Sequence, residues 1–125
     1  HFYDIVNGYE IQKEVIEQYY MDTKEESYKG ISIMLLNSLK TSLYNVNNSD
    51  LMEKEIKSLI ESYVNNPSII EASKDKGSIE YFDKQYLDAI LNKNIGYLYK
   101  LGKEAKNKQK FKSILINLAT KSNLF

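Results

Sequence analysis

Apolar residues recur every three or four positions along almost the whole chain, which is the spacing of one face of an α-helix. The alternation of apolar and polar residues that a half-buried strand requires is not sustained anywhere. The pattern therefore predicts an all-α fold. We expect a single irregular bundle of five or six amphipathic helices, forming one domain over residues 1–125, because a chain of this length fits one core.

The first two predicted helices differ in how apolar they are. The first has an apolar face, and an acidic stripe on the opposite face that comprises Glu10, Glu14 and Glu17. It should end near Asp22, because Thr23 and Glu26 have the spacing of a capping box for the next helix. The second helix, residues 24–44, has the broadest apolar face. We expect it to be central, with Leu35 and Leu39 buried.

The rest of the chain predicts three more segments before the C-terminal region. Asp50 is expected to cap a third helix that ends near residue 63. Asn66 and Pro67 have the pattern of an N-cap followed by a first-turn proline, which predicts a short helix over residues 67–74. Gly77 is expected to end that helix in the left-handed conformation. A longer helix with a wide apolar surface is then predicted over residues 78–101.

The last predicted helix follows a break or kink at Gly102. Its apolar stripe comprises Phe111, Ile114, Leu115 and Leu118, and its lysines are Lys103, Lys106, Lys108, Lys110 and Lys112. These five lysines are predicted to contact an anionic partner. Two alternatives are open. The lysines can border a stripe that packs on the core, or they can lie beside the acidic residues 4–26 and offset their charge.

The composition excludes many catalytic mechanisms. The chain has no Cys and no Trp, and its one His is residue 1. All 17 of its basic residues are lysines, so no arginine is available to hold an anion. A buried imidazole or thiolate cannot be assembled away from the N-terminus. We therefore expect no catalytic residues, no cofactor and no metal. An enzyme that relies on carboxylates and tyrosines alone is the remaining alternative. The acidic stripe is interpreted as solvated, since bundle metal sites pair Glu with His.

Tyrosine is the most overused residue, with 11 copies. So many hydroxyl groups cannot all find partners in one core, and some should lie at the surface, where Tyr is favoured in interfaces. Tyr81, Tyr97 and Tyr99 are predicted as interface aromatics. An alternative is that the Tyr, Asn, Ile and Lys content reflects codon usage in an AT-rich genome.

The chain gives limited information about where the protein resides. Residues 65–77 are similar to stretches in the extracytoplasmic helical input domains of bacterial membrane receptors, and this resemblance implies a sensor-like, extracytoplasmic domain. No apolar run approaches the length of a membrane-spanning helix. The chain starts at His1, so we expect it to be cut or processed from a longer protein.

Together these observations favour a non-catalytic binding domain of a surface or membrane-anchored protein. It would engage a protein or small ligand through exposed Tyr and Lys. The main rival is an intracellular helical regulator that contacts nucleic acid or a protein through its basic C-terminal helix. Acidic and basic residues balance at 17 each, so nucleic acid is not expected as an obligatory partner.

Overall fold

The computed structural model describes residues 2–121, without the side chains of residues 109, 110 and 119–121. The predicted all-α class is confirmed: 88% of the described residues are helical, and no strand occurs among them. The number of α-helices in this range is seven rather than five or six. In chain order the elements are α1 (Phe2–Tyr19), the short 3-10 turn η1 (Met21–Thr23), α2 (Lys24–Asn47), α3 (Glu53–Val64), α4 (Pro67–Lys74), α5 (Lys76–Tyr81), α6 (Lys84–Leu91) and α7 (Ile95–Lys121).

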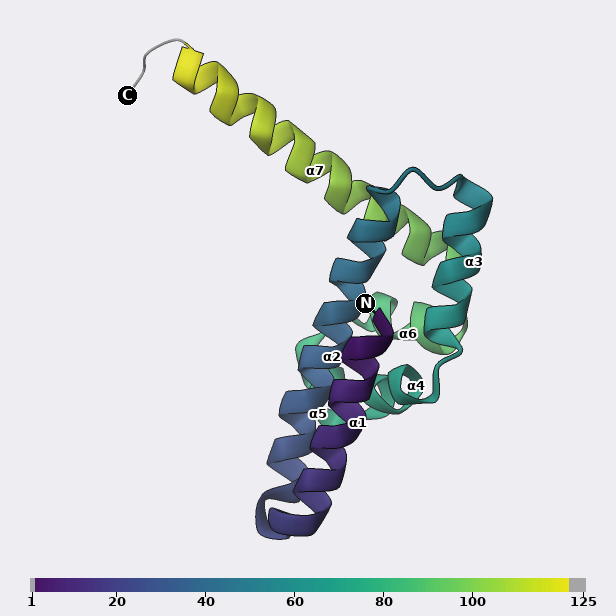
Figure 1. The fold of residues 1–125 in the computed structure, drawn as a ribbon, viewed down its shortest axis with the longest axis vertical. Helices are drawn as coiled ribbons and strands as arrows, with labels where there is room; N and C mark the ends of the chain where they lie inside the picture. Colours follow the sequence, from purple (N-terminus) through teal and green to yellow (C-terminus); the bar gives the residue numbers. More distant parts are fainter. Residues whose placement is uncertain (1, 122–125) are drawn as a thin grey trace.

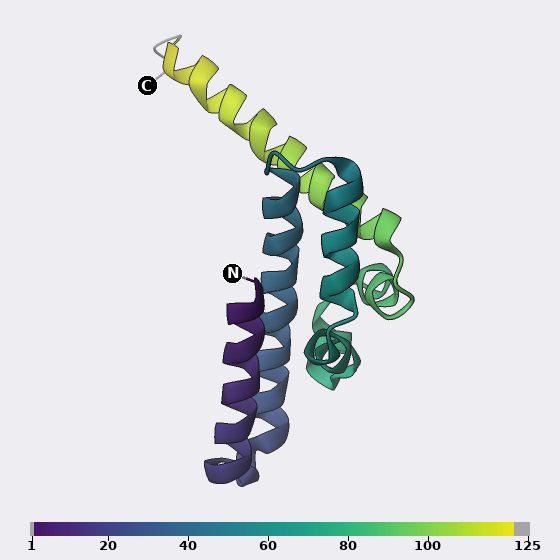
Figure 2. The ribbon, with the colours of Figure 1, turned by 45° about the vertical axis from the view of Figure 1, so that its right-hand side comes forward.

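Helix α2 is the central element, as its apolar pattern predicted. It forms a long hairpin with α1 and also packs against α3, α4, α5 and α7 (Figures 1 and 2). The turn of this hairpin extends beyond α4 and α5 at one end of the molecule. At the other end α7 crosses α2 and continues well beyond the bundle.

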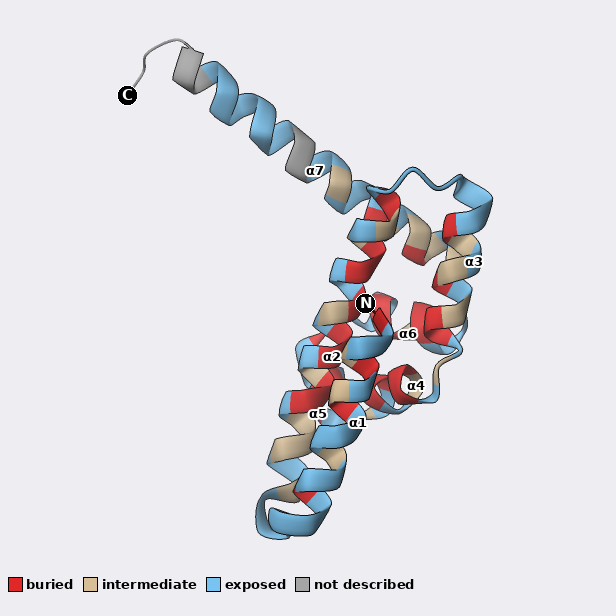
Figure 3. Cartoon of the chain, viewed as in Figure 1, coloured by how far each residue is buried: buried red, intermediate tan, exposed pale blue. Residues whose placement is uncertain are grey.

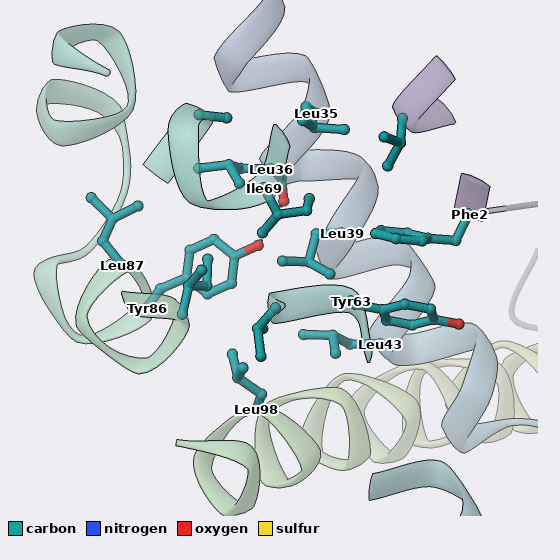
Figure 4. Packing of buried hydrophobic residues seen from close by; sticks show 14 of the residues in the cluster. Phe2, Leu35, Leu36, Leu39, Leu43, Tyr63, Ile69, Tyr86, Leu87 and Leu98 are labelled. Carbon is teal, nitrogen blue, oxygen red and sulfur yellow. Dashed lines mark hydrogen bonds between the residues drawn. The ribbon is translucent and has the colours of Figure 1, made fainter. Parts of the chain in front are cut away.

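The core lies along the inner face of α2 (Figure 4). Leu35 and Leu39 are 2% and 0% exposed, which confirms the prediction that both are buried. Tyr86 of α6 reaches into the same core, where its hydroxyl donates a hydrogen bond to the backbone oxygen of Leu36 at 2.7 Å. A partner is required there, because a buried hydroxyl without one is costly.

Helix α4 begins as its sequence predicted. Asn66 is the N-cap, and its side-chain oxygen accepts a hydrogen bond from the backbone N–H of Ser68 at 2.9 Å. Pro67 occupies the first helical position, where its missing N–H would have had no intrahelical partner.

The predicted caps of α2 and α3 are not formed. Thr23 precedes α2, but its hydroxyl donates backwards to the carbonyl of Tyr20 at 3.4 Å instead of accepting from the new helix. Asp50 lies too early to cap α3, which begins at Glu53. The carboxylate of Glu55 accepts from the N–H of Met52 at 3.5 Å in its place.

The long helix predicted over residues 78–101 is wrong, because the chain turns twice within it. Phe82 has extended backbone angles (φ −97°, ψ 155°) and is buried between α5 and α6. Lys93 adopts the left-handed conformation (φ 55°) between α6 and α7, and Asn94 then accepts from the N–H of Tyr97 at 3.2 Å. The wide apolar surface of the segment explains the turns: a straight helix cannot aim both of its apolar faces at one core.

Gly77 does not end α4 in the left-handed conformation. It is the second residue of α5, and its N–H donates to the carboxylate of Asp75 at 2.9 Å. A Cβ at this position would lie 2.7 Å from the Cα of Lys29. The glycine therefore permits a close approach of α5 to α2.

Candidate functional site: the projecting half of α7

The first part of α7 is anchored to the bundle at the C-terminal end of α2. Leu98 is fully buried. A Cβ at Gly102 would lie 2.6 Å from the backbone oxygen of Leu43, so the two helices touch at this point. Lys106 donates from its ammonium group to the backbone oxygen of Asn47 at 2.8 Å. A lysine at this position satisfies a free carbonyl at the end of α2 and complements the helix dipole.

Gly102 neither ends nor kinks α7, contrary to the sequence expectation, since the helix runs without interruption from Ile95 to Lys121. Residues 107–121, here called the arm, leave the bundle (Figures 1 and 3). Every arm residue whose side chain is described is exposed. The exposed fractions of the apolar side chains are 63% for Phe111, 46% for Ile114 and 51% for Leu115. The alternative in which this stripe packs on the core is therefore wrong.

The stripe faces away from the bundle because of helical geometry. Phe111 follows Gly102 by nine residues, or about two and a half turns, which places it on the opposite side of the helix. Ile114 and Leu115 fall within about 60° of Phe111. The stripe cannot be turned toward this chain's own core without breaking α7.

Lysines border the stripe. Lys108 and Lys112 lie along one border, and Lys103 precedes the arm on the other. Lys110 belongs to that second border by its sequence position, but its side chain lies outside those described. Residues 105–121 contain five lysines and no acidic residue. Four of the five predicted lysines thus have described side chains, and one of them, Lys106, binds the backbone oxygen of Asn47.

The predicted aromatic residues do not form one cluster. Tyr81 is the last residue of α5 and is 61% exposed. Its ring packs edge to face against that of Phe82, with the ring centres 4.9 Å apart. Tyr97 and Tyr99 are half-buried at the start of α7. Among the side chains described, Tyr99 is the one of the three that contacts a predicted lysine: the ammonium group of Lys103 lies 5.9 Å from the centre of its ring.

A second exposed apolar group, at the turn of the α1/α2 hairpin, was missed by the sequence analysis. Its members Tyr19, Tyr20 and Met21 are 74%, 56% and 57% exposed. The sequence signal was an apolar triplet directly before a predicted cap, which places it in a turn rather than on a helix face. We call residues 14–26 the hairpin tip. It carries five acidic residues and one lysine, Lys24.

The acidic stripe of α1 is exposed, and two of its three carboxylates accept hydrogen bonds from neighbouring side chains. Glu10 accepts from the hydroxyl of Ser68 at 2.9 Å, and Glu17 accepts from the hydroxyl of Tyr28 at 2.6 Å. Burial, together with the adjacent Glu17 carboxylate, raises the pKa of Tyr28 to about 12. Among the residues described, no group of three or more His, Cys, Asp or Glu side chains is placed to hold a metal ion.

The acidic and basic segments lie at opposite ends of the molecule (Figure 1). The hairpin tip is at the N-terminal end of α2, whereas the arm leaves from its C-terminal end. The alternative in which residues 4–26 offset the basic helix within one chain is therefore wrong. The hairpin tip is therefore an acidic surface and the arm a basic one, and each has exposed apolar side chains.

The fold and the site define an all-α bundle that extends one amphipathic helix beyond its core. No helix within residues 2–121 combines the length and the apolar character needed to cross a bilayer. Comparison of this chain with protein-family models, curated proteins and solved structures gave no match.

Proposed function

We propose that this chain is a non-catalytic binding domain that docks through its arm onto an acidic protein surface. The observation that carries the proposal is the exposed stripe of Phe111, Ile114 and Leu115. It lies on the arm, which projects beyond the bundle (Figure 3). Apolar side chains at one-turn spacing on a helix are a common means of entering a groove on a partner.

The charge of the arm selects the partner. Lysines on both borders of the stripe repel a basic surface and attract an acidic one, which favours the correct encounter and disfavours the wrong one. The partner should therefore present apolar side chains surrounded by Asp or Glu.

A protein groove suits the arm better than a flat bilayer. Ile116 is 58% exposed and lies about 140° around the helix from Phe111, beyond the lysine border. A bilayer covers only one stripe of a helix lying on its surface and would leave Ile116 in water. A groove can cover a wider arc.

Nucleic acid is also a weaker candidate. Lys106 already binds the end of α2, which leaves fewer lysines free for phosphates.

Two further features support a binding role. The chain has no Cys, no Arg and no His away from residue 1, so catalysis by an internal imidazole, thiolate or guanidinium group is not available to it. Of the surface hollows, the one beside α3 and α7 is shallow and is lined largely by charged residues such as Glu53 and Lys54, so this hollow does not resemble a small-molecule site. A small-molecule site is normally deeper and more apolar. The surface or membrane-anchored, sensor-like setting stays a prediction.

The test uses a synthetic probe, a helical peptide with a leucine stripe bordered by glutamates. Titration followed by NMR should show saturable binding that moves the signals of the arm and weakens with salt. Reversing two lysines in Lys108→Glu/Lys112→Glu should weaken binding by about tenfold or more, since each exposed ion pair contributes up to about 1 kcal/mol.

The apolar contribution is tested with matched isoleucines. Ile114→Ser should weaken binding of the peptide, whereas Ile79→Ser on α5 should not, although Ile79 is 60% exposed. Duplex DNA and phosphatidylserine-containing vesicles are measured in parallel. Arm-dependent binding to either of these, with none to the peptide, would overturn the proposal.

A further inference from the structure

The two ends of the molecule are complementary in charge and in apolar character. The arm presents an apolar stripe bordered by lysines, and the hairpin tip presents Tyr19, Tyr20 and Met21 among five acidic residues. Of the tip carboxylates, Glu14 and Asp22 are exposed, and among the residues described no lysine forms an ion pair with either.

These two surfaces cannot meet within one chain. Helix α2 has 24 residues and is therefore about 36 Å long. The arm leaves from its C-terminal end at Asn47, and the tip lies at its N-terminal end. The stripe lies only five to twelve residues beyond Lys106, or about 8 to 18 Å along the helix axis. The arm is too short to reach the tip of its own chain and extends in the opposite direction (Figure 1).

Pairing of like ends is disfavoured. Two arms laid against each other would bring lysines together along both borders, and two tips would bring their acidic residues together. The remaining combination joins the arm of one molecule to the tip of another.

We propose that the partner of the arm is the hairpin tip of a second copy of this chain. This inference rests on the proposed function of the arm as a docking element for an acidic protein surface, and it names that surface. Each contact is heterologous, because it joins two different surfaces. Two molecules can exchange arms, or successive molecules can form a chain. Both assemblies contain the same contact.

The contact is small. One helix on one hairpin turn belongs to the class of interfaces below about 1,200 Å², which are typical of weak or transient association. We therefore expect association only at protein concentrations from about 10 µM to 1 mM. It should weaken with salt, since the Debye length falls to about 3 Å at 1 M.

The experiment is a charge exchange followed by analytical ultracentrifugation over a concentration series. The arm variant is Lys108→Glu/Lys112→Glu, and the tip variant is Glu14→Lys/Asp22→Lys. Either variant alone should associate at least about tenfold more weakly than wild type, because like charges then face each other. An equimolar mixture should associate again, because each reversed surface then finds its complement. A chain carrying all four substitutions should also recover association.

The matched control is Lys54→Glu/Lys74→Glu, which reverses two exposed lysines on α3 and α4 and should associate like wild type. Circular dichroism verifies the fold of every variant. If one variant is less stable, recovery of association in the equimolar mixture still distinguishes charge reversal from loss of the fold. Wild type that stays monomeric to about 1 mM, or an arm variant that associates normally, would refute the inference. If wild type is monomeric while the acidic peptide still binds the arm, only the self-association fails and the proposed function stands.

Discussion

Gly102 of α7 lies directly against the backbone of Leu43 of α2. A Cβ at Gly102 would be 2.6 Å from the Leu43 carbonyl oxygen and 2.6 Å from the side-chain nitrogen of Asn47. The side-chain nitrogen of Asn47 itself donates to the same carbonyl at 2.9 Å. This close crossing sets the direction in which α7 leaves the bundle, and so the position of the arm.

Gly102→Ala should therefore lower the free energy of unfolding by about 1 to 3 kcal/mol, because the backbone oxygen cannot move aside as a flexible side chain would. The control is Gly30→Ala in α2, where the added Cβ would meet no atom within 4 Å apart from the neighbouring backbone of its own helix. There the higher helix propensity of Ala should raise stability by up to about 1 kcal/mol. Urea unfolding measures both changes. Equal stability of the two variants would show that α7 does not approach α2 at Gly102 as closely as these distances indicate.

Truncation should destabilise the fold at one leucine, Leu39, and have little effect on stability at another, Leu115. Leu39 is 0% exposed in the core and Leu115 is 51% exposed on the arm. Leu39→Ala should cost about 2 to 5 kcal/mol of unfolding free energy, through lost burial and the cavity left behind. Leu115→Ala should change stability by less than about 0.5 kcal/mol. A large loss at Leu115, measured at low protein concentration, would place the arm against the bundle.

Lys106 should matter for stability and Lys108 should not. The ammonium group of Lys106 is half-buried and donates to the carbonyl of Asn47, whereas Lys108 is exposed on the arm. Lys106→Met should cost about 1 kcal/mol, the usual contribution of a charged group at a helix C-terminus. Thermal unfolding of both Met variants tests this. If Lys108→Met is the more damaging, the assignment of Lys106 as the anchor is wrong.

The pH dependence of stability should show the buried tyrosines. Burial, with Glu71 nearby, raises the pKa of Tyr9 from its ordinary value of 10 to about 12. The folded state then holds this proton more tightly than the unfolded state does. The stabilisation is fully present below pH 10 and is lost as the pH rises through about 12. Over this pH range, the urea midpoint of the Tyr9→Phe variant should fall less steeply than that of wild type. Equal slopes for the two proteins would contradict the raised pKa of Tyr9.

Glu17→Gln should lower the pKa of Tyr28. Removing the carboxylate removes its repulsion of the phenolate, while burial, the larger cause of the shift, remains. The pKa should therefore fall only part of the way from about 12 toward 10, as followed by NMR of the tyrosine ring. Tyr9 serves as the internal control. A shift of Tyr9 as large as that of Tyr28 would point to a general change in the fold.

The sequence predicted the features that depend on neighbouring residues. Periodicity identified α2 as the central helix and Leu35 and Leu39 as core residues, because burial follows from an apolar face at helical spacing. The start of α4 was also predictable, since the capping side chain of Asn66 and the fixed φ of Pro67 act within one turn.

The site was predicted only in part. The lysines near the C-terminus were recognised because charge can be read from composition, but Tyr19 and Tyr20 were missed. Their exposure depends on how far the α1/α2 hairpin extends past α4 and α5, which is a matter of packing.

What the sequence by itself determined is the helical class, the central helix and the amphipathic character of residues 103–118, all of which depend on local spacing. The tertiary structure alone decided where the chain turns at Phe82 and Lys93, and that the stripe of the last helix faces away from the core. The reason is physical: an amphipathic pattern requires that a face be covered but does not specify what covers it. Helix α7 crosses α2 at Gly102 and then continues beyond the end of the bundle, and this projection leaves the stripe available to another molecule.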